Sequence, residues 1–301
     1  MRVKVILNPW SDRGNAVKAT EQIKALGAQY GQLDLEMTSR PGHATQLATE
    51  ALDAGYDLIV AAGGDGTVHE VSNGLVHGDR SQATMGVIPI GSGNDFAYAL
   101  KIPTSLEEAV SRLFTGERRQ ISLARIEDDK GRFSIVANGI GIGFDATISI
   151  ESRNITRIHG FAMYLLATLR TIAFYYQTPN FEVQFDGETI HQKVLLLALG
   201  VGPRAGGGFL LTPEATHFDN LLDSCTVDPV KRLTMLRVLT KVMKGSHTNL
   251  PFVTMRRNQY VNIKSDQPLP IHTDGEIFAY PEDQIHRVTI TSLPDALAVM
   301  M

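Results

Sequence analysis

The stretch DLIVAAGGDGTVHEVSNG, residues 57–74, predicts a parallel α/β fold. Its first part, residues 57–62, is almost wholly apolar, as expected of a strand that is buried on both faces of a sheet. Glycine-rich sequence around Asp65 follows, and a helical pattern begins near Thr67. Such a strand–glycine–helix junction is typical of the carboxyl edge of a doubly wound sheet, the edge at which these folds bind ligands.

The same alternation runs through residues 1–122. Short apolar runs predict further strands at 3–7, 33–37 and 85–90, and apolar spacing predicts helices at about 15–26 and 44–52. Because strands and helices alternate, we expect an α/β domain over residues 1–122 with a doubly wound, mostly parallel sheet and helices on both faces.

The pattern changes after residue 121. Residues 181–185 and 261–264 alternate apolar and polar side chains, 194–199 and 225–227 are further strand candidates, and 161–176 and 233–244 are helical. This half predicts antiparallel β structure with a few helices, and therefore a second domain, over residues 123–283.

Length and composition exclude several classes of protein. The 301 residues suffice for about two domains, and 43% hydrophobic residues exclude a disordered chain. The net charge of −4 gives no sign of a nucleic-acid partner, and a single cysteine excludes intramolecular disulfides. No apolar run is long enough to span a membrane, so we expect a cytoplasmic globular protein.

Two further loops follow predicted strands and resemble the first in chemistry. GSGNDFAYAL (91–100) supplies two glycines ahead of a helix, and NPWSD (8–12) follows the first strand. Glycines allow close approach of the backbone to phosphates, and amides at a helix N-terminus can bind them, so the loops predict a nucleotide site. Asp65 would repel a bare phosphate, which favours it as a partner of magnesium or of a hydroxyl. Asn94 or Asp95 capping a helix is the alternative for the second loop.

Several motifs in order resemble the catalytic-domain family of diacylglycerol kinases, which includes bacterial lipid kinases and the sphingosine and ceramide kinases. They are GGDGT (63–67) with Glu70 and Asn73-Gly74, IPIGSGNDFA (88–97), NGIGIGFDA (138–146), GPRAGGGFLLTPEA (202–215), the acids Asp219 and Asp223, and DGE (274–276). The resemblance implies ATP- and Mg²⁺-dependent transfer of a γ-phosphoryl group to a lipid hydroxyl, with diacylglycerol or a related lipid as acceptor.

The resemblance also implies a fold. The second domain would be an antiparallel β-sandwich that receives the lipid, and the active site would lie in the interdomain cleft. The C-terminal segment, about residues 284–301, would return to the first domain, and the stretch 286–291 fits that return.

Site residues follow from the same resemblance together with the loop positions. The nucleotide site would contain Asn8, Pro9, Trp10, Ser11, Asp12, Thr38, Gly63, Gly64, Asp65, Gly66, Thr67, Val68, His69, Glu70, Gly91, Ser92, Gly93 and Asn94. Glu276 would be the catalytic proton acceptor, with Asp65 as the second catalytic residue. Thr216, Asp219 and the backbone carbonyl of Leu221 would hold magnesium.

Three positions depart from the family pattern. The first loop reads NPWSDRG, with Asp12 where the family usually has a glycine directly after the small residue. Ser92 stands where threonine is commoner, and it keeps the hydroxyl. Asn220 stands at a glycine position; because asparagine tolerates positive φ, we expect the turn to be retained.

Alternatives remain open at this point. The chain could be a kinase for a soluble acceptor such as NAD, or a catalytically silent nucleotide- or lipid-binding module, and DGE could be a plain hairpin turn. A lipid substrate requires docking at a membrane surface, for which the basic face of helix 233–244 is one candidate and a solvated face the alternative. Helix 161–176 is expected to be packed, with a lipid-contacting helix as the alternative. A homodimer is also an open alternative.

Overall fold

The computed structural model describes residues 1–76 and 83–301, which divide into two compact units. The first unit comprises Met1–Leu123 and Pro294–Met301, and the second comprises Ala124–Leu293. Each is described by itself below.

A parallel sheet forms the centre of the first unit. Its strands, in the order β2-β1-β3-β4, are β1 (Val3–Leu7), β2 (Leu33–Met37), β3 (Leu58–Gly63) and β4 (Thr84–Pro89). All three pairings are parallel, and the end of β16 (Arg287–Met300) adds Ala298 and Val299 in parallel beside β4. Every residue of β3 is buried, as its apolar sequence predicts.

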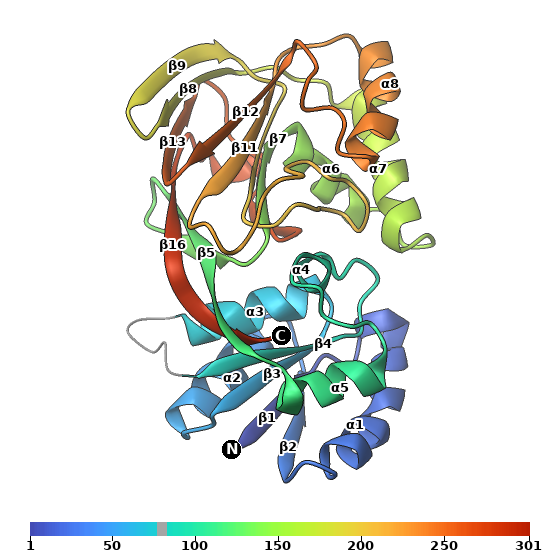
Figure 1. Cartoon of the computed structure of the whole chain (residues 1–301). Helices are drawn as coiled ribbons and strands as arrows, with labels where there is room; N and C mark the ends of the chain where they lie inside the picture. The colour runs from blue at the N-terminus through green and yellow to red at the C-terminus, as the bar shows by residue number, and fades with distance from the viewer. Residues whose placement is uncertain (77–82) are drawn as a thin grey trace. The chain divides into compact units, whose positions relative to one another are not determined.

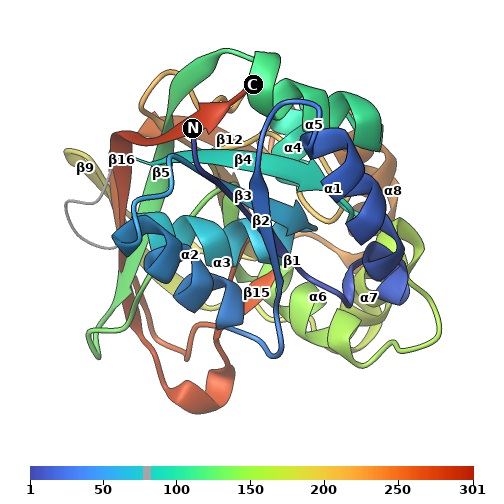
Figure 2. The same cartoon turned by 90° about the horizontal axis from the view of Figure 1, so that it is seen from below.

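Helices cover both faces of this sheet. They are α1 (Thr20–Gly27), α2 (His43–Asp53), α3 (Asp65–Leu75), α4 (Asp95–Ala99) and α5 (Leu106–Thr115), preceded by a 3₁₀ segment, η1 (Ser11–Ala19). The packed pair α2 and α3 lies on one face, and α1 with α5 lies on the other (Figures 1 and 2). The helix expected at 15–26 becomes α-helical only at Thr20, because the chain before it is 3₁₀ with a left-handed kink at residues 12–14.

Two antiparallel sheets form the second unit. One contains β8 (Asn180–Phe185), β9 (Glu188–Lys193), β13 (Tyr260–Ser265), β6 (Phe133–Val136) and parts of β5 (Arg118–Asp128) and β16. The other has the order β12-β11-β10-β7-β14-β15, with β7 (Gly139–Gly143), β10 (Leu196–Gly200), β11 (Leu222–Val227), β12 (Val253–Asn258), β14 (Ile271–Thr273) and β15 (Glu276–Ala279). This confirms the antiparallel β structure that the sequence pattern predicts and the β-sandwich that the family resemblance implies.

The sandwich core follows from the alternation along its strands. Phe181, Val183 and Phe185 of β8 point into the same apolar cluster as Leu197 and Leu199 of β10. The neighbouring residues of β10 face the other way, under three helices: α6 (Phe144–Arg153), α7 (Gly160–Phe174) and α8 (Arg232–Met243). Figure 1 shows these helices on the outer side of the sheet that contains β7 and β11.

The C-terminal strand divides between the units. Residues up to Thr291 pair with β13, where Thr291 lies opposite Tyr260, so they belong to the second unit. The return to the first unit therefore begins at Pro294 rather than at about residue 284, and the stretch 286–291 is not part of it. Among residues 1–76 and 83–301, no helix is both long enough and apolar enough to cross a bilayer.

Candidate active site

The carboxyl ends of the parallel strands bring the predicted nucleotide residues to one edge of the first unit. Residues 8–12 follow β1, Thr38 follows β2, and residues 63–70 and 91–94 follow β3 and β4. Backbone bonds at this edge hold the loops in register. The amide of Asn8 donates to the carbonyl of Ala62 at 3.0 Å, and that of Thr38 donates to Leu7 at 2.9 Å.

The loops after β3 and β4 meet backbone to backbone. A Cβ atom on Gly91 would lie less than 3.0 Å from both Cα of Gly64 and Oδ1 of Asn94. A Cβ atom on Gly63 would likewise lie less than 3.0 Å from the hydroxyl of Thr67. Glycine is therefore required at these positions for packing within the protein, besides any approach to phosphate.

Two side chains of this set hold the loops in place. One carboxylate oxygen of Asp65, the first residue of α3, accepts from the amide of Phe96 at 3.1 Å and so ties this loop to α4. Asn94 exchanges two hydrogen bonds with Gly91, of 3.0 and 2.8 Å, and has a φ of 52°. Its side chain does not cap α4, which disposes of that alternative for Asn94.

Glu70 has a structural partner that the sequence did not predict. Its carboxylate accepts from the amides of Gly42 at 2.8 Å and Ala44 at 2.9 Å, at the start of α2. Acidic side chains stabilise helix N-termini in this way. Glu70 therefore positions the turn that follows Thr38, and Val68, which is 3% exposed, can face a nucleotide only through its backbone.

The first loop departs from the rest in conformation. Trp10 is 61% exposed, and its amide donates to the Asn8 side chain at 3.0 Å. Asp12, Arg13 and Gly14 all have positive φ. Two consecutive non-glycine residues in the left-handed region are unusual, and the Asp12 side chain between Ser11 and Arg13 is exposed.

In the second unit, the DGE motif forms a two-residue hairpin turn between β14 and β15. Thr273 pairs with Glu276 across the turn, and Asp274 and Gly275 have φ values of 54° and 87°. The Glu276 side chain is 51% exposed and accepts from Arg153 Nη2 at 2.6 Å. The hairpin geometry thus leaves this carboxylate accessible to a reactant.

Asp274 fixes the turn to the neighbouring strand. Its carboxylate accepts from the amides of Ala137, Asn138 and Gly139 at 2.9, 2.7 and 2.9 Å. Three charge-assisted bonds from consecutive amides hold a carboxylate tightly. The position of Glu276 is therefore set two residues away, by Asp274.

The residues predicted to hold magnesium share one loop of the second unit. Oδ1 of Asp219 accepts from the amide of Leu221 at 3.1 Å, and its other oxygen pairs with Arg257. Asn220 between them has a φ of 64°, which confirms that asparagine supports the turn in place of glycine. Nearby Asp223 is 4% exposed, Oδ2 of its carboxylate has no hydrogen-bond partner, and burial raises the pKa of its carboxyl to about 6.

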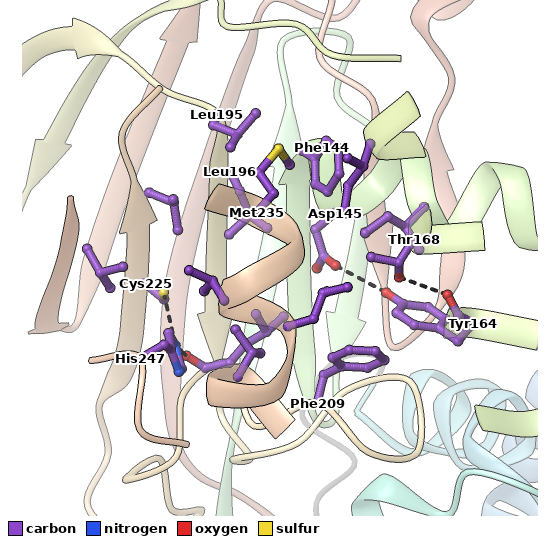
Figure 3. A pocket seen from close by; sticks show the side chains of 18 residues that line it. Phe144, Asp145, Tyr164, Thr168, Leu195, Leu196, Phe209, Cys225, Met235 and His247 are labelled. Carbon is purple, nitrogen blue, oxygen red and sulfur yellow. Dashed lines mark hydrogen bonds between the residues drawn. The ribbon is translucent and has the colours of Figure 1, made fainter. Parts of the chain in front are cut away.

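An apolar cavity of about 90 Å³ lies beneath α6, α7 and α8, and the sequence did not predict it (Figure 3). Its walls are almost entirely hydrocarbon, and include Ile148, Leu195, Phe209 and Leu239. The exception that carries charge is Asp145, at the start of α6.

Asp145 is buried and hydrogen-bonded through both oxygens. Oδ1 accepts from the Tyr164 hydroxyl at 3.1 Å, and Oδ2 lies 3.0 Å from Nε2 of His272. The pair with His272 passes over Gly141, where a Cβ atom would lie less than 3.0 Å from both groups. The motif NGIGIGFDA already indicates that Asp145 could be functional, since it places this acid at a glycine-rich strand end. The partners of Asp145 come from distant segments, so the motif does not reveal them.

Comparison with known proteins agrees with this geometry. Residues 2–126 match the family model of the diacylglycerol kinase catalytic domain, and residues 138–301 match that of the YegS C-terminal NAD kinase beta sandwich-like domain. A solved structure of a diacylglycerol kinase from Bacillus anthracis superposes with a TM-score of 0.75 at 21% identity, over 99% of this chain and 96% of that one. At that identity the likeness shows the fold.

Relatives extend over nearly the whole chain. The diacylglycerol kinase of Bacillus subtilis is 30% identical over 282 residues, 91% of this chain and 89% of its own length. The diacylglycerol kinase of Mycobacterium tuberculosis is 30% identical over 302 residues, 99% and 94% of the two chains. A YegS-like lipid kinase homologue of Xanthomonas axonopodis is 34% identical over 279 residues, 88% and 86% of the two chains. The chain belongs to the diacylglycerol kinase and YegS-like lipid kinase family and is a kinase, a phosphotransferase.

Proposed function

We propose that this kinase transfers the γ-phosphoryl group of ATP to a hydroxyl of diacylglycerol or a closely related lipid. The observation that carries the proposal is the apolar cavity beneath α6–α8, which has one charged side chain, Asp145, in its lining. An empty apolar cavity stays dry and binds hydrocarbon. A lipid whose chain enters it would bring polar headgroup atoms toward Asp145, because that carboxylate can accept a hydrogen bond from a hydroxyl group.

The loops of the first unit support a nucleoside triphosphate as the phosphoryl donor. Close approach of the Gly64 and Gly91 backbones leaves a surface without side chains at the carboxyl edge of the sheet. Amides at the start of α3 add positive partial charge there, which favours phosphate groups. Residues 8–12 and Thr38 complete the same edge.

Glu276 supplies the base in this proposal. The attacking lipid hydroxyl has a pKa far above 7, so a carboxylate within hydrogen-bond reach takes its proton as the new P–O bond forms. The carboxylate is exposed and rests on a turn that Asp274 holds rigidly. Phosphoryl transfer depends on positioning and charge neutralisation more than on covalent chemistry, and this turn would contribute the positioning of the base.

Magnesium would bind Thr216, Asp219 and the carbonyl of Leu221. These are oxygen donors, which Mg²⁺ prefers, and the unpaired buried oxygen of Asp223 next to them favours a cation. Arg257 already pairs with Asp219, so the ion would either share the Asp219 carboxylate with that guanidinium or displace the guanidinium. In the described part of the chain no three His, Cys, Asp or Glu side chains gather as a metal site. The donor set fits, and bound Mg²⁺ would neutralise negative charge.

Docking at a membrane would use α7 and α8, which contact one another and line the cavity. One face of α7 is packed, as expected, but its end exposes Leu169, Phe174 and Tyr175, and α8 exposes Leu233, Leu236 and Met243. The basic residues Arg170, Arg232, Arg237, Lys241 and Lys244 are also exposed on these helices. An apolar face with basic residues fits the surface of an anionic bilayer.

The test is one incubation of the protein with labelled ATP and Mg²⁺ against separate acceptors: diacylglycerol, monoacylglycerol, phosphatidylglycerol, sphingosine, ceramide and NAD. We expect labelled phosphate in the diacylglycerol arm. Label in NAD alone would replace the lipid with a soluble acceptor, and no label in any arm despite ATP binding would make the chain a silent binding module. Replacing Leu196 with a larger side chain should then raise the KM for lipid and leave that for ATP unchanged, since Leu196 lines the cavity.

A further inference from the structure

His272 has two hydrogen-bond partners with different chemistry. Its Nδ1 accepts from the amide of Gly275 at 3.3 Å, in the turn that carries Glu276. Its Nε2 lies 3.0 Å from Oδ2 of Asp145 in the cavity wall. The imidazole is therefore in contact with both the proposed base turn and the proposed lipid pocket.

The partners fix the tautomer of the ring. An amide can only donate, so Nδ1 must present a lone pair to Gly275 and the proton must sit on Nε2. That proton then faces a carboxylate oxygen, which is the favourable arrangement for an Asp–His pair. Both side chains are nearly buried, with exposed fractions of 5% and 4%, so solvent does not compete for the bond.

The same hairpin contacts α6 at a second place. Asp145 lies in the first turn of α6 and Arg153 is its last residue, and they pair with His272 of β14 and Glu276 of β15. The register of this hairpin shifts between Ile271 and His272, where β15 has one more residue than β14. Irregularities of this kind are common next to functional sites.

We propose that His272 is a positioning residue that couples occupancy of the lipid pocket to the placement of Glu276. Its bond to Gly275 holds the turn of the base, and its bond to Asp145 orients the carboxylate that meets the lipid headgroup. The inference rests on the proposed lipid-kinase function with Glu276 as base.

Two substitutions separate the two bonds. His272→Asn places an amide oxygen where Nδ1 was, so it keeps the acceptor for Gly275 and loses the reach to Asp145. His272→Gln places an amide N–H where Nε2 was, so it keeps the donor to Asp145 and loses the acceptor for Gly275. Both variants replace the imidazole ring with an uncharged amide side chain.

We expect the two variants to affect different kinetic constants. His272→Gln should lower kcat by about 10–100-fold with the lipid KM near wild type, because a base displaced by about an ångström loses much of its effect. His272→Asn should raise the lipid KM several-fold and change kcat little. The KM for ATP should be unchanged in both, since the predicted nucleotide residues belong to the first unit.

A merely structural role would lower the melting temperature of both variants and leave the kinetic constants per folded molecule alone, or change them in parallel. Either result overturns the inference. If His272→Gln does not fold, a double-mutant cycle between His272→Asn and Asp145→Asn decides: non-additive effects on the lipid KM support the coupling, and additive effects reject it.

Glu276→Gln separates this inference from the proposed function. If wild type phosphorylates no lipid, or if Glu276→Gln retains full kcat, the proposed function or its base is wrong. If Glu276→Gln is inactive while both His272 variants match wild type, the proposed function stands and only the coupling fails.

Discussion

Arg153, the last residue of α6, donates to the Glu276 carboxylate at 2.6 Å, with both side chains about half exposed. The buried pair of Asp145 and His272 fastens the other end of the same helix to the same hairpin. The two pairs differ in environment, so they should differ in their contributions to stability and in their response to salt.

The exposed pair should contribute little to folding. Arg153→Ala should lower the free energy of unfolding by no more than about 1 kcal/mol, because solvent and salt screen an exposed ion pair. Urea unfolding at low and high salt measures this, with His272→Ala for comparison. The His272 change should cost about 1–3 kcal/mol at both salt concentrations, since it leaves buried polar groups unpaired. Equal costs would mean that the Arg153 pair is shielded from solvent.

Gly141 should not tolerate a side chain. The Cβ of Gly141→Ala would collide with both the Asp145 carboxylate and the His272 ring, so the pair must separate. We expect a loss of about 1–3 kcal/mol in the free energy of unfolding and a lower rate of transfer to lipid. Gly187→Ala is the control, because a Cβ there has no neighbour within 4 Å. A Gly141→Ala protein as stable as this control would show that the two side chains can part at no cost.

Local sequence patterns were sufficient to predict the strands of the first unit and the hairpin turn at DGE. A run such as residues 58–62 can be apolar throughout only where helices cover both faces, and an Asp-Gly pair between strands sets its own turn. The left-handed backbone at Asn220 could be foreseen for the same reason, since it depends on one residue.

The contacts of the site could not be predicted in this way. Glu70 caps α2 from a helix that begins more than 20 residues later, and His272 meets Asp145 across 127 positions of sequence. Such contacts depend on which elements the fold places together, and no local period encodes that. The cavity is hidden for the same reason, because its lining residues look like ordinary core positions in the sequence.

The close approach of Gly64 and Gly91 should be necessary for nucleotide binding. Gly91→Ala would push the loops after β3 and β4 apart and displace Asn94 from its two bonds with residue 91. ATP affinity, measured by titration, should fall by about tenfold or more, as expected when a backbone cradle for phosphate is misplaced. Ser92→Thr adds bulk in the same loop but keeps the hydroxyl, and it should bind ATP like wild type. Weak binding by both would point to a general intolerance of this loop.

Membrane association should depend on the exposed apolar residues of α7 and α8. Replacing Phe174 and Leu233, 74% and 70% exposed, with serine should weaken binding to anionic vesicles without changing the melting temperature. Phe133→Ser, which removes a 43% exposed aromatic residue outside these helices, is the control. Wild-type binding should also weaken with added salt. Unchanged vesicle sedimentation by the double variant would remove these helices from the docking surface.

His217 should make folding sensitive to mild acid. The ring is 1% exposed with Nε2 2.8 Å from the Ala137 carbonyl, and burial lowers its pKa from 6.5 to about 4. The negative charges of Asp274 and Asp219 favour the imidazolium but offset this only in part. Below pH 6.5 His217 is protonated in the unfolded chain, whereas in the folded protein it is protonated only as the pH approaches about 4. The stability contributed by the neutral ring is therefore complete above pH 6.5 and is lost as the pH falls to 4, by about 3 kcal/mol.

The variant His217→Gln isolates this contribution. Its amide N–H can still donate to the Ala137 carbonyl, but glutamine does not titrate. Carboxyl groups also titrate in this range in both proteins, among them Asp223, whose pKa burial raises to about 6. The difference in stability between the two proteins is therefore the quantity to measure. Denaturant unfolding at steps from pH 7.5 to 4 should show wild type losing stability relative to His217→Gln only below pH 6.5, with the difference growing toward pH 4. A constant difference over that range would mean that the folded protein accepts the proton as readily as the unfolded chain, and that the ring is not isolated from solvent.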